Sequence, residues 1–317
     1  MKLKDIYELA VKVGKEADPR DLDMIDGQLT KVAEAFEKLS DSEKELFDQE
    51  KLKNPYADTR LLVGDPDKEI NGLIAGIDIE TPEVLLADRL RERGQQIDMI
   101  LAHHPEGAAL ASLHEVMGLQ ADLWSQYGVP IHMGDAIIDP RSKEVQRALS
   151  PANHNRAVDA AAALDFPLMC VHTPADNLVS NFLQSAFDDD PPIFLDDVVK
   201  RLKAVPEYAE ATRINAGPKI IVGAGNKRAG KVMILMTGGT GGPEESIEKL
   251  ADAGVGTVVE MHLSEKLKKK AEECHLNVII AGHIASDNIG MNLLLDKLES
   301  HGVETSTCSG LFRVKRN

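Results

Sequence analysis

The sequence has few aromatic residues, few cysteines and no long apolar run. Aromatic residues make up 4% of the 317 residues, so the core must rely on Leu, Ile, Val, Ala and Met. The three cysteines, Cys170, Cys274 and Cys308, lie far apart and form no CxxC pair, which predicts reduced thiols in a cytosol. No apolar run approaches the length of a membrane span, and the N-terminus lacks the apolar core of a signal peptide. We therefore expect a cytoplasmic protein without a membrane partner.

Basic residues are scarce relative to acidic ones. The chain has 36 Lys and Arg against 52 Asp and Glu, which gives a formal net charge of -16. A surface of that sign repels phosphate backbones, so we expect no nucleic-acid partner. One short basic run, at 266–270, is interrupted by Leu267 and is interpreted as the solvated face of a helix.

The chain divides into two regions that differ in their pattern of apolar residues. Residues 1–55 predict a helical extension, because apolar residues recur at three- and four-residue steps until Asn54-Pro55. Residues 56–317 alternate short apolar runs with helical segments, which is typical of α/β folds. Residues 188–218 are less regular, and residues 223–226 predict a hairpin turn. The expected strands cover 73–77, 97–102, 129–133, 167–171, 232–236, 255–259 and 278–281, and the expected helices cover 81–93, 155–165, 244–253, 264–273 and 289–299.

Residues that can bind metals follow four of these strands. In α/β sheets, ligands bind at the carboxyl ends of the strands. Imidazole and carboxylate together suit Zn, Fe, Mn, Co or Ni. Two histidines on neighbouring residues cannot easily bind one ion from opposite sides, but each can serve one of two ions that share a carboxylate, a known hydrolytic arrangement. The four strand ends carry His103-His104, His172 with Asp176, Glu260 with His262, and His283 with Asp287.

Three of these motifs, in this order and setting, resemble the Nif-three-like family, also described as GTP cyclohydrolase I type-two homologues. A Gly-rich stretch at 238–242 and the Glu260-x-His262 pair precede the last motif, as the family pattern expects. The resemblance covers residues 60–317. Its three motifs are the strand into His103-His104-Pro105, the His172-Thr173-x-x-Asp176 box and the Gly282-His283-x-x-x-Asp287 box.

The resemblance implies a two-domain α/β fold with mixed sheets flanked by helices and a dinuclear metal site between the halves. It also implies a toroidal homo-oligomer, a hexamer. Carried over by position, two divalent ions per chain would be held by His103, His104, Asp176, His283 and Asp287, and His172 and His262 would be supporting or catalytic residues.

The chain departs from the family pattern in three places. The last box ends in Asp287, where the family usually has Glu, so a bridging carboxylate would have to lie closer to the metals. A segment around 130–165, with His132 and Asp135, is inserted between His104 and His172. The N-terminal helical region has no counterpart. Asp287 is therefore expected either to bridge two ions or to act only as the N-cap of the helix over 289–299.

Three functions are compatible with these residues. The first is a metal-dependent hydrolase acting on a small molecule such as a nucleotide or phosphoester, with His172 or Glu260 carrying the proton. The second is a non-catalytic regulatory or trafficking protein that binds metal. The third is a scaffold with structural metals, which would require a closed coordination shell. Residues 238–242 could cradle an anion, or form a bare turn, but they lack the lysine of a P-loop.

Overall fold

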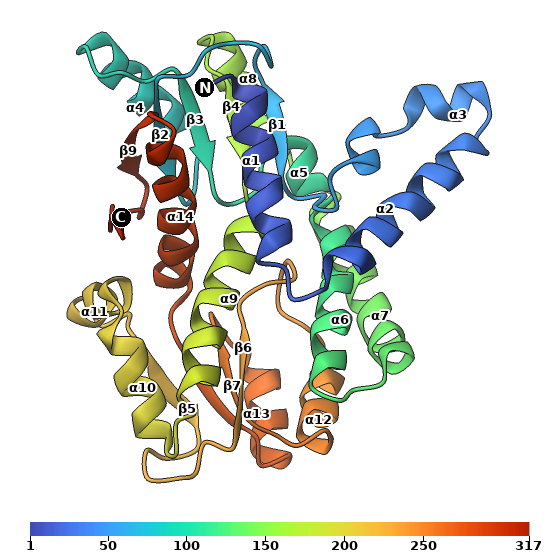
Figure 1. Ribbon diagram of the computed structural model, residues 1–317, viewed down its shortest axis with the longest axis vertical. Helices are drawn as coiled ribbons and strands as arrows, with labels where there is room; N and C mark the ends of the chain where they lie inside the picture. Colours follow the sequence, from blue (N-terminus) through green and yellow to red (C-terminus); the bar gives the residue numbers. More distant parts are fainter. Residues whose placement is uncertain (317) are drawn as a thin grey trace.

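The computed structural model describes residues 1–316 and contains two mixed β-sheets near opposite ends of the molecule, with long helices between them (Figure 1). The expected α/β fold with mixed sheets flanked by helices is confirmed. In the first sheet, the edge strand β1 pairs antiparallel with β4, and the remaining pairs are parallel. Its order is β1 (Arg60–Val63), β4 (Leu168–Cys170), β3 (Met99–Ala102), β2 (Gly72–Gly76) and β9 (Glu304–Cys308).

The second sheet repeats this plan with one strand fewer. Its edge strand β5 pairs antiparallel with β8, and the other two pairs are parallel. Because β7 and β8 separate β5 from β6, the turn after β5 joins the two edges of the sheet, and the predicted hairpin at 223–226 is wrong. The order is β5 (Lys219–Val222), β8 (Asn277–Ile280), β7 (Val255–Glu260) and β6 (Lys231–Leu235).

Each half of the molecule ends with a parallel strand that leads into a long helix. Strand β4 leads into α9 (Thr173–Asp189), and β8 leads into α14 (His283–Ser300). The two helices cross so closely that a Cβ on Gly290 would lie 2.2 Å from the carbonyl oxygen of Ala175. Only a residue without a side chain fits there. This contact brings the first turns of both helices together between the two sheets.

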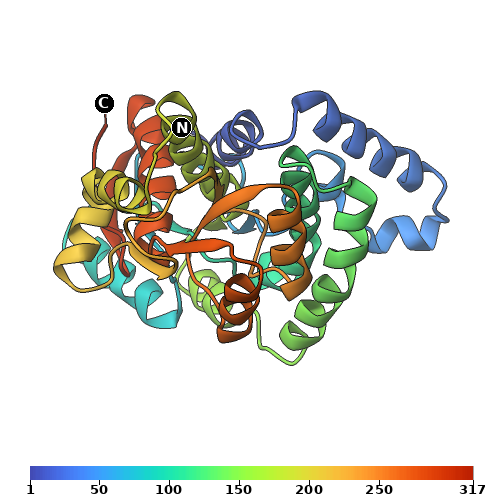
Figure 2. The ribbon, with the colours of Figure 1, turned by 90° about the horizontal axis from the view of Figure 1, so that it is seen from below.

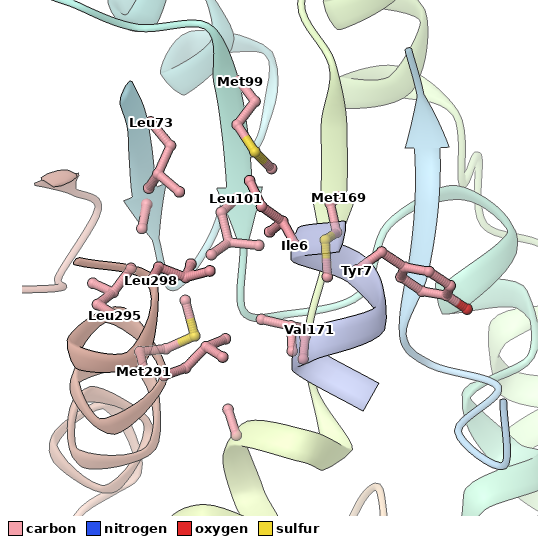
Figure 3. Packing of buried hydrophobic residues seen from close by; sticks show 14 of the residues in the cluster. Ile6, Tyr7, Leu73, Met99, Leu101, Met169, Val171, Met291, Leu295 and Leu298 are labelled. Carbon is pink, nitrogen blue, oxygen red and sulfur yellow. The ribbon is translucent and has the colours of Figure 1, made fainter. Parts of the chain in front are cut away.

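The first helix belongs to the core. Helix α1 (Leu3–Glu16) buries Leu3, Ile6 and Ala10 in a cluster with side chains of the first sheet and of α14. Figure 3 shows Ile6 between Leu101 of β3 and Met169 of β4. The apolar spacing of α1 therefore marks a face that completes the hydrophobic core.

The remainder of the N-terminal region extends outward. Helices α2 (Leu22–Glu37) and α3 (Asp41–Leu46) project from the side of the molecule near α6 and α7 (Figures 1 and 2), and Ile25 is the one buried residue of α2. A short 3₁₀ helix, Gln49–Leu52, leads back to the first sheet. The boundary at residue 55 and the inserted segment around 130–165 stay predictions.

Truncation of Ile6 to alanine is expected to lower the free energy of unfolding by about 2–5 kcal/mol, because a buried Ile side chain is lost and a cavity is left. Ile6 is 1% exposed. The matched control is Met24→Ala on α2, where the side chain is 44% exposed and the expected change is within about 0.5 kcal/mol. Chemical denaturation measures both. Equal losses in the two variants would show that α1 is not part of the core.

The structure differs in three places from the strands and helices expected from the sequence. Residues 129–133 form no strand, because Pro130 precedes α7, which begins at Ile131. A run of five residues is too short for its pattern to distinguish a strand from the start of a helix. Residues 188–218 contain two helices. The helix expected over 289–299 begins six residues earlier, at His283. The helices not yet given are α4 (Thr81–Glu92), α5 (Gly107–Ala111), the 3₁₀ helix Leu113–Gly118, α6 (Leu119–Gln126), α7 (Ile131–Leu149), α8 (Arg156–Ala163), α10 (Leu195–Ala204), α11 (Pro206–Arg213), α12 (Glu244–Asp252) and α13 (Glu265–Glu273).

Among the helices of residues 1–316, none combines the length and the apolar character that crossing a bilayer would need.

Candidate metal centre

The histidines and aspartates of three strand ends meet between the two halves. His103 and His104 follow β3, His172 lies between β4 and α9, and His283 is the first residue of α14. The carboxyl ends of parallel strands point to the same edge of a sheet, and the contact between α9 and α14 joins the two edges. Ligand atoms from these elements form three groups in which all atoms lie within 4.8 Å of one another: His103, His104 and His172; His104, His283 and Asp287; and His103, Asp176 and Asp287.

Asp287 lies at the centre of this arrangement and presents one oxygen to each side. Its Oδ1 is 3.5 Å from Nε2 of His103. Its Oδ2 is 3.5 Å from Nε2 of His104 and 3.7 Å from Nε2 of His283. The residue is buried in the second turn of α14, whose N-cap is Gly282. The alternative that Asp287 only caps a helix is therefore wrong.

Asp176 links His103 to the remaining histidine, His172. Its Oδ1 is 3.5 Å from Nε2 of His103, and its Oδ2 is 3.7 Å from Nε2 of His172. His172 is the N-cap of α9 and Asp176 lies in its first turn, while His283 is the first residue of α14 and Asp287 lies in its second turn. A spacing of four residues places both side chains on one face of a helix, which explains why the two His-x-x-x-Asp boxes point into the same space.

The other ring nitrogen of three histidines is held by an oxygen outside the cluster. Nδ1 of His103 is 3.1 Å from the carbonyl oxygen of Val171, and Nδ1 of His104 is 2.7 Å from Oδ1 of Asp78. Nδ1 of His172 is 2.8 Å from Oδ2 of Asp58. A nitrogen that donates to such an oxygen leaves Nε2 as the lone-pair acceptor, which is how metal-binding histidines are oriented.

Several polar atoms of the cluster are buried without a hydrogen bond. Among the described residues, Nε2 of His103, Oδ1 of Asp176 and both oxygens of Asp287 have no hydrogen-bond partner. Unpaired polar atoms are costly to bury, so their concentration at one point calls for a group that satisfies them. The distances fit a metal ion, because two ligands about 2.1 Å from one tetrahedral ion lie ~3.4 Å apart.

The ionisation states of His103 and Asp287 also suit a divalent cation. Burial lowers the pKa of His103 to about 4, which keeps its imidazole neutral. Burial alone would raise the pKa of Asp287, but the adjoining His103 and His104 hold that pKa well below its usual range. Neutral imidazole and ionised carboxylate are the forms that bind metals. The buried His and Asp groups can therefore hold a metal.

Asp78→Asn is expected to weaken metal binding by about 10–100-fold, because the asparagine cannot hold the Nδ1 proton of His104 as a carboxylate does. Asp78 is more than half exposed, so the variant should fold normally. Its control is Asp88→Asn on α4, an acidic residue that pairs with Arg91 away from the cluster. Competition with a chelator measures the affinity. Unchanged affinity in Asp78→Asn would remove Asp78 from the support of the centre.

The structure brings together most of the residues singled out from the sequence. His103, His104, Asp176, His283 and Asp287 converge, and His172 joins them. Glu260 and His262 line an adjoining pocket, and neither belongs to the three ligand groups found within residues 1–316. The rings of His262 and His283 are 5.1 Å apart. His132 and Asp135 of the expected insertion are exposed on α7.

Three supporting residues were missed from the sequence. Asp78 follows the end of β2 after one residue, Ile77, so the rule that located the histidines could have found it. Asp58 lies 114 residues before its partner His172 and precedes the edge strand β1, where no local pattern marks it. Gln120 of α6, which lines the adjoining pocket, likewise carries no signal in the sequence.

Comparison with known proteins gives a consistent result at the level of structure. No family model matches the chain, and no curated protein matches it. The solved structure of a NIF3 superfamily protein from Sphaerobacter thermophilus is similar, with a TM-score of 0.71 and 28% identity, over 82% of this chain and 94% of that one. Protein ybgI, described as of unknown function, is similar in fold, with a TM-score of 0.50 and 15% identity, over 98% of each chain.

The likeness to the Sphaerobacter protein extends over nearly the whole of that chain and most of this one. The resemblance noted in the sequence carries the same family name. Together they support the assignment of this chain to the Nif-three-like, or NIF3, family.

Proposed function

We propose that this protein binds two divalent metal ions and uses them for hydrolysis of a small molecule such as a nucleotide or phosphoester. The observation that carries the proposal is the position of Asp287 between two sets of ligands. On one side lie His103 and Asp176, and on the other lie His104 and His283. Each set supplies three ligand atoms when one Asp287 oxygen is included, which leaves positions for water or substrate. Candidate ions are Zn, Fe, Mn, Co and Ni.

Two divalent ions held by these two ligand sets would polarise a substrate and lower the pKa of a bound water molecule to near neutrality. The residues of the chain have separate roles. Asp58 and Asp78 orient His172 and His104 through their Nδ1 atoms. His172 holds Asp176 in place, and Glu260 and His262 face the pocket in which a substrate would lie. Glu260 and His262 are the groups placed to take up or return a proton.

The experiment is a hydrolysis screen of the metal-loaded protein against nucleotides, phosphoesters and cyclic amides. Activity on one class is expected, with loss on chelation and recovery when the metal is returned. Glu260→Gln should lower kcat on that substrate and keep the metal content. A protein that keeps two ions but hydrolyses nothing would favour the alternative, a non-catalytic metal-binding protein in regulation or trafficking.

The assembly and location of the protein stay proposals of the same kind. We expect a homo-oligomer, a hexamer by resemblance, in the cytoplasm. Light scattering on purified protein measures the number of chains, and a monomer at micromolar concentration would contradict the expectation.

A further inference from the structure

The pocket beside the metal ligands has a wall of polar groups that the ligand set does not use. The wall is formed by the ends of β6 and β7 and by the start of α6. It includes Thr237, the Gly-rich stretch 239–242, Glu260 and Gln120, and it faces His172, Asp176 and His283. Any small molecule that reached the metal ligands from this side would contact these groups.

Gln120 presents a hydrogen-bond acceptor with a fixed orientation. Its Nε2 donates to the carbonyl oxygens of Gly238, at 2.7 Å, and Thr240, at 2.6 Å. Because both amide hydrogens are used, the side chain cannot flip without losing them, and Oε1 is left as the free acceptor. The residue is 2% exposed, and Oε1 is buried without a partner among residues 1–316.

The loop and Gln120 are fitted to each other. A Cβ on Gly242 would lie 2.7 Å from Oε1 of Gln120, and Gly238, at φ +101°, has a backbone conformation that side chains disfavour. Thr237, at the start of the loop, donates to Oδ1 of Asn177 at 2.6 Å. The loop is therefore tied to Gln120 of α6 on one side and to Asn177 of α9 on the other.

Glu260 presents a second acceptor to the same pocket. It is the last residue of β7 and 7% exposed, and its Oε1 is buried without a hydrogen bond or a cation in the described chain. Burial raises the pKa of this carboxyl to about 8. Burying a carboxyl without a partner is costly, so its retention indicates a ligand rather than a structural role.

We propose that this pocket binds a group rich in N–H donors, such as an amide, ureide, amidine or guanidine, through Oε1 of Gln120 and the carboxyl of Glu260. Two buried acceptors that lack hydrogen-bond donors favour a ligand that donates hydrogen bonds over a phosphate or carboxylate ion, which only accepts them. The inference rests on the proposed function in taking the pocket as the place of the substrate, and it assigns the nitrogen-bearing end of that substrate to the wall opposite the metals.

The test uses hydantoin, which has N–H groups at both nitrogens, and 1,3-dimethylhydantoin, which has none. Calorimetric titration into the purified protein should show hydantoin binding at least about tenfold more tightly, since each unmet buried acceptor is costly. Glu260→Leu should reduce hydantoin affinity by about tenfold or more. The control Glu245→Leu, an exposed carboxylate in the first turn of α12, should leave affinity unchanged.

Metal content is measured on every sample, so this proposal and the proposed function fail separately. Equal binding of the two hydantoins, or unchanged hydantoin affinity in Glu260→Leu with the fold retained, would overturn the ligand class. Loss of metal in Glu260→Leu would also overturn it, because Glu260 would then be a ligand of the ions. Absence of ions from the wild type would contradict the metal proposal alone.

Discussion

Asp287→Asn is expected to release one or both metal ions, and Asp287→Glu is expected to retain them. Two divalent ions about 4 Å apart repel each other by on the order of 15 kcal/mol at an effective dielectric constant of about 20. The ligand set carries only the negative charges of Asp176 and Asp287 to offset that repulsion. Asparagine removes the charge and one of the two equivalent oxygens, whereas glutamate keeps both. Metal analysis after gel filtration measures the outcome.

The control for this pair is Asp296→Asn on the same helix, at a position that pairs with Arg313 far from the cluster. It should keep the metal of the wild type and lose only stability. Thermal unfolding of each variant separates metal loss from misfolding. If Asp287→Asn folds and keeps two ions, Asp287 does not bridge them, and the assignment fails at its central residue.

His103→Ala and His104→Ala are each expected to lose at least one ion, because each histidine supplies an Nε2 to a different side of Asp287. His103 is fully buried, so His103→Gln serves as a variant with less change in volume. The controls are His114→Ala and His301→Ala, whose residues lie outside the three ligand groups found in residues 1–316. Equal metal content in all four alanine variants would show that the paired histidines are not ligands.

The sequence was sufficient for the fold class because short apolar runs mark buried strands. It was also sufficient for the set of residues that converge, because parallel strands end at a common edge. Two His-x-x-x-Asp boxes, each after such a run, lie at the beginnings of α9 and α14. Adjacent histidines after β3 then reach the same space from the first sheet.

The sequence failed where local pattern carries little information. Residues 283–288 contain few apolar positions, so the start of α14 was placed too late and Asp287 could be mistaken for a cap. Strand β9 is a mostly polar edge strand without an apolar run. Asp58 depends on a contact across 114 residues, which no periodicity reveals.

The most direct test of the account is the number of divalent ions per chain in protein purified without chelators. Elemental analysis should give close to two equivalents. Anomalous diffraction from crystals of the same protein should place both ions between α9 and α14, one on each side of Asp287. Metal content near zero or one, or a single anomalous peak away from Asp287, would contradict the proposal of a dinuclear centre.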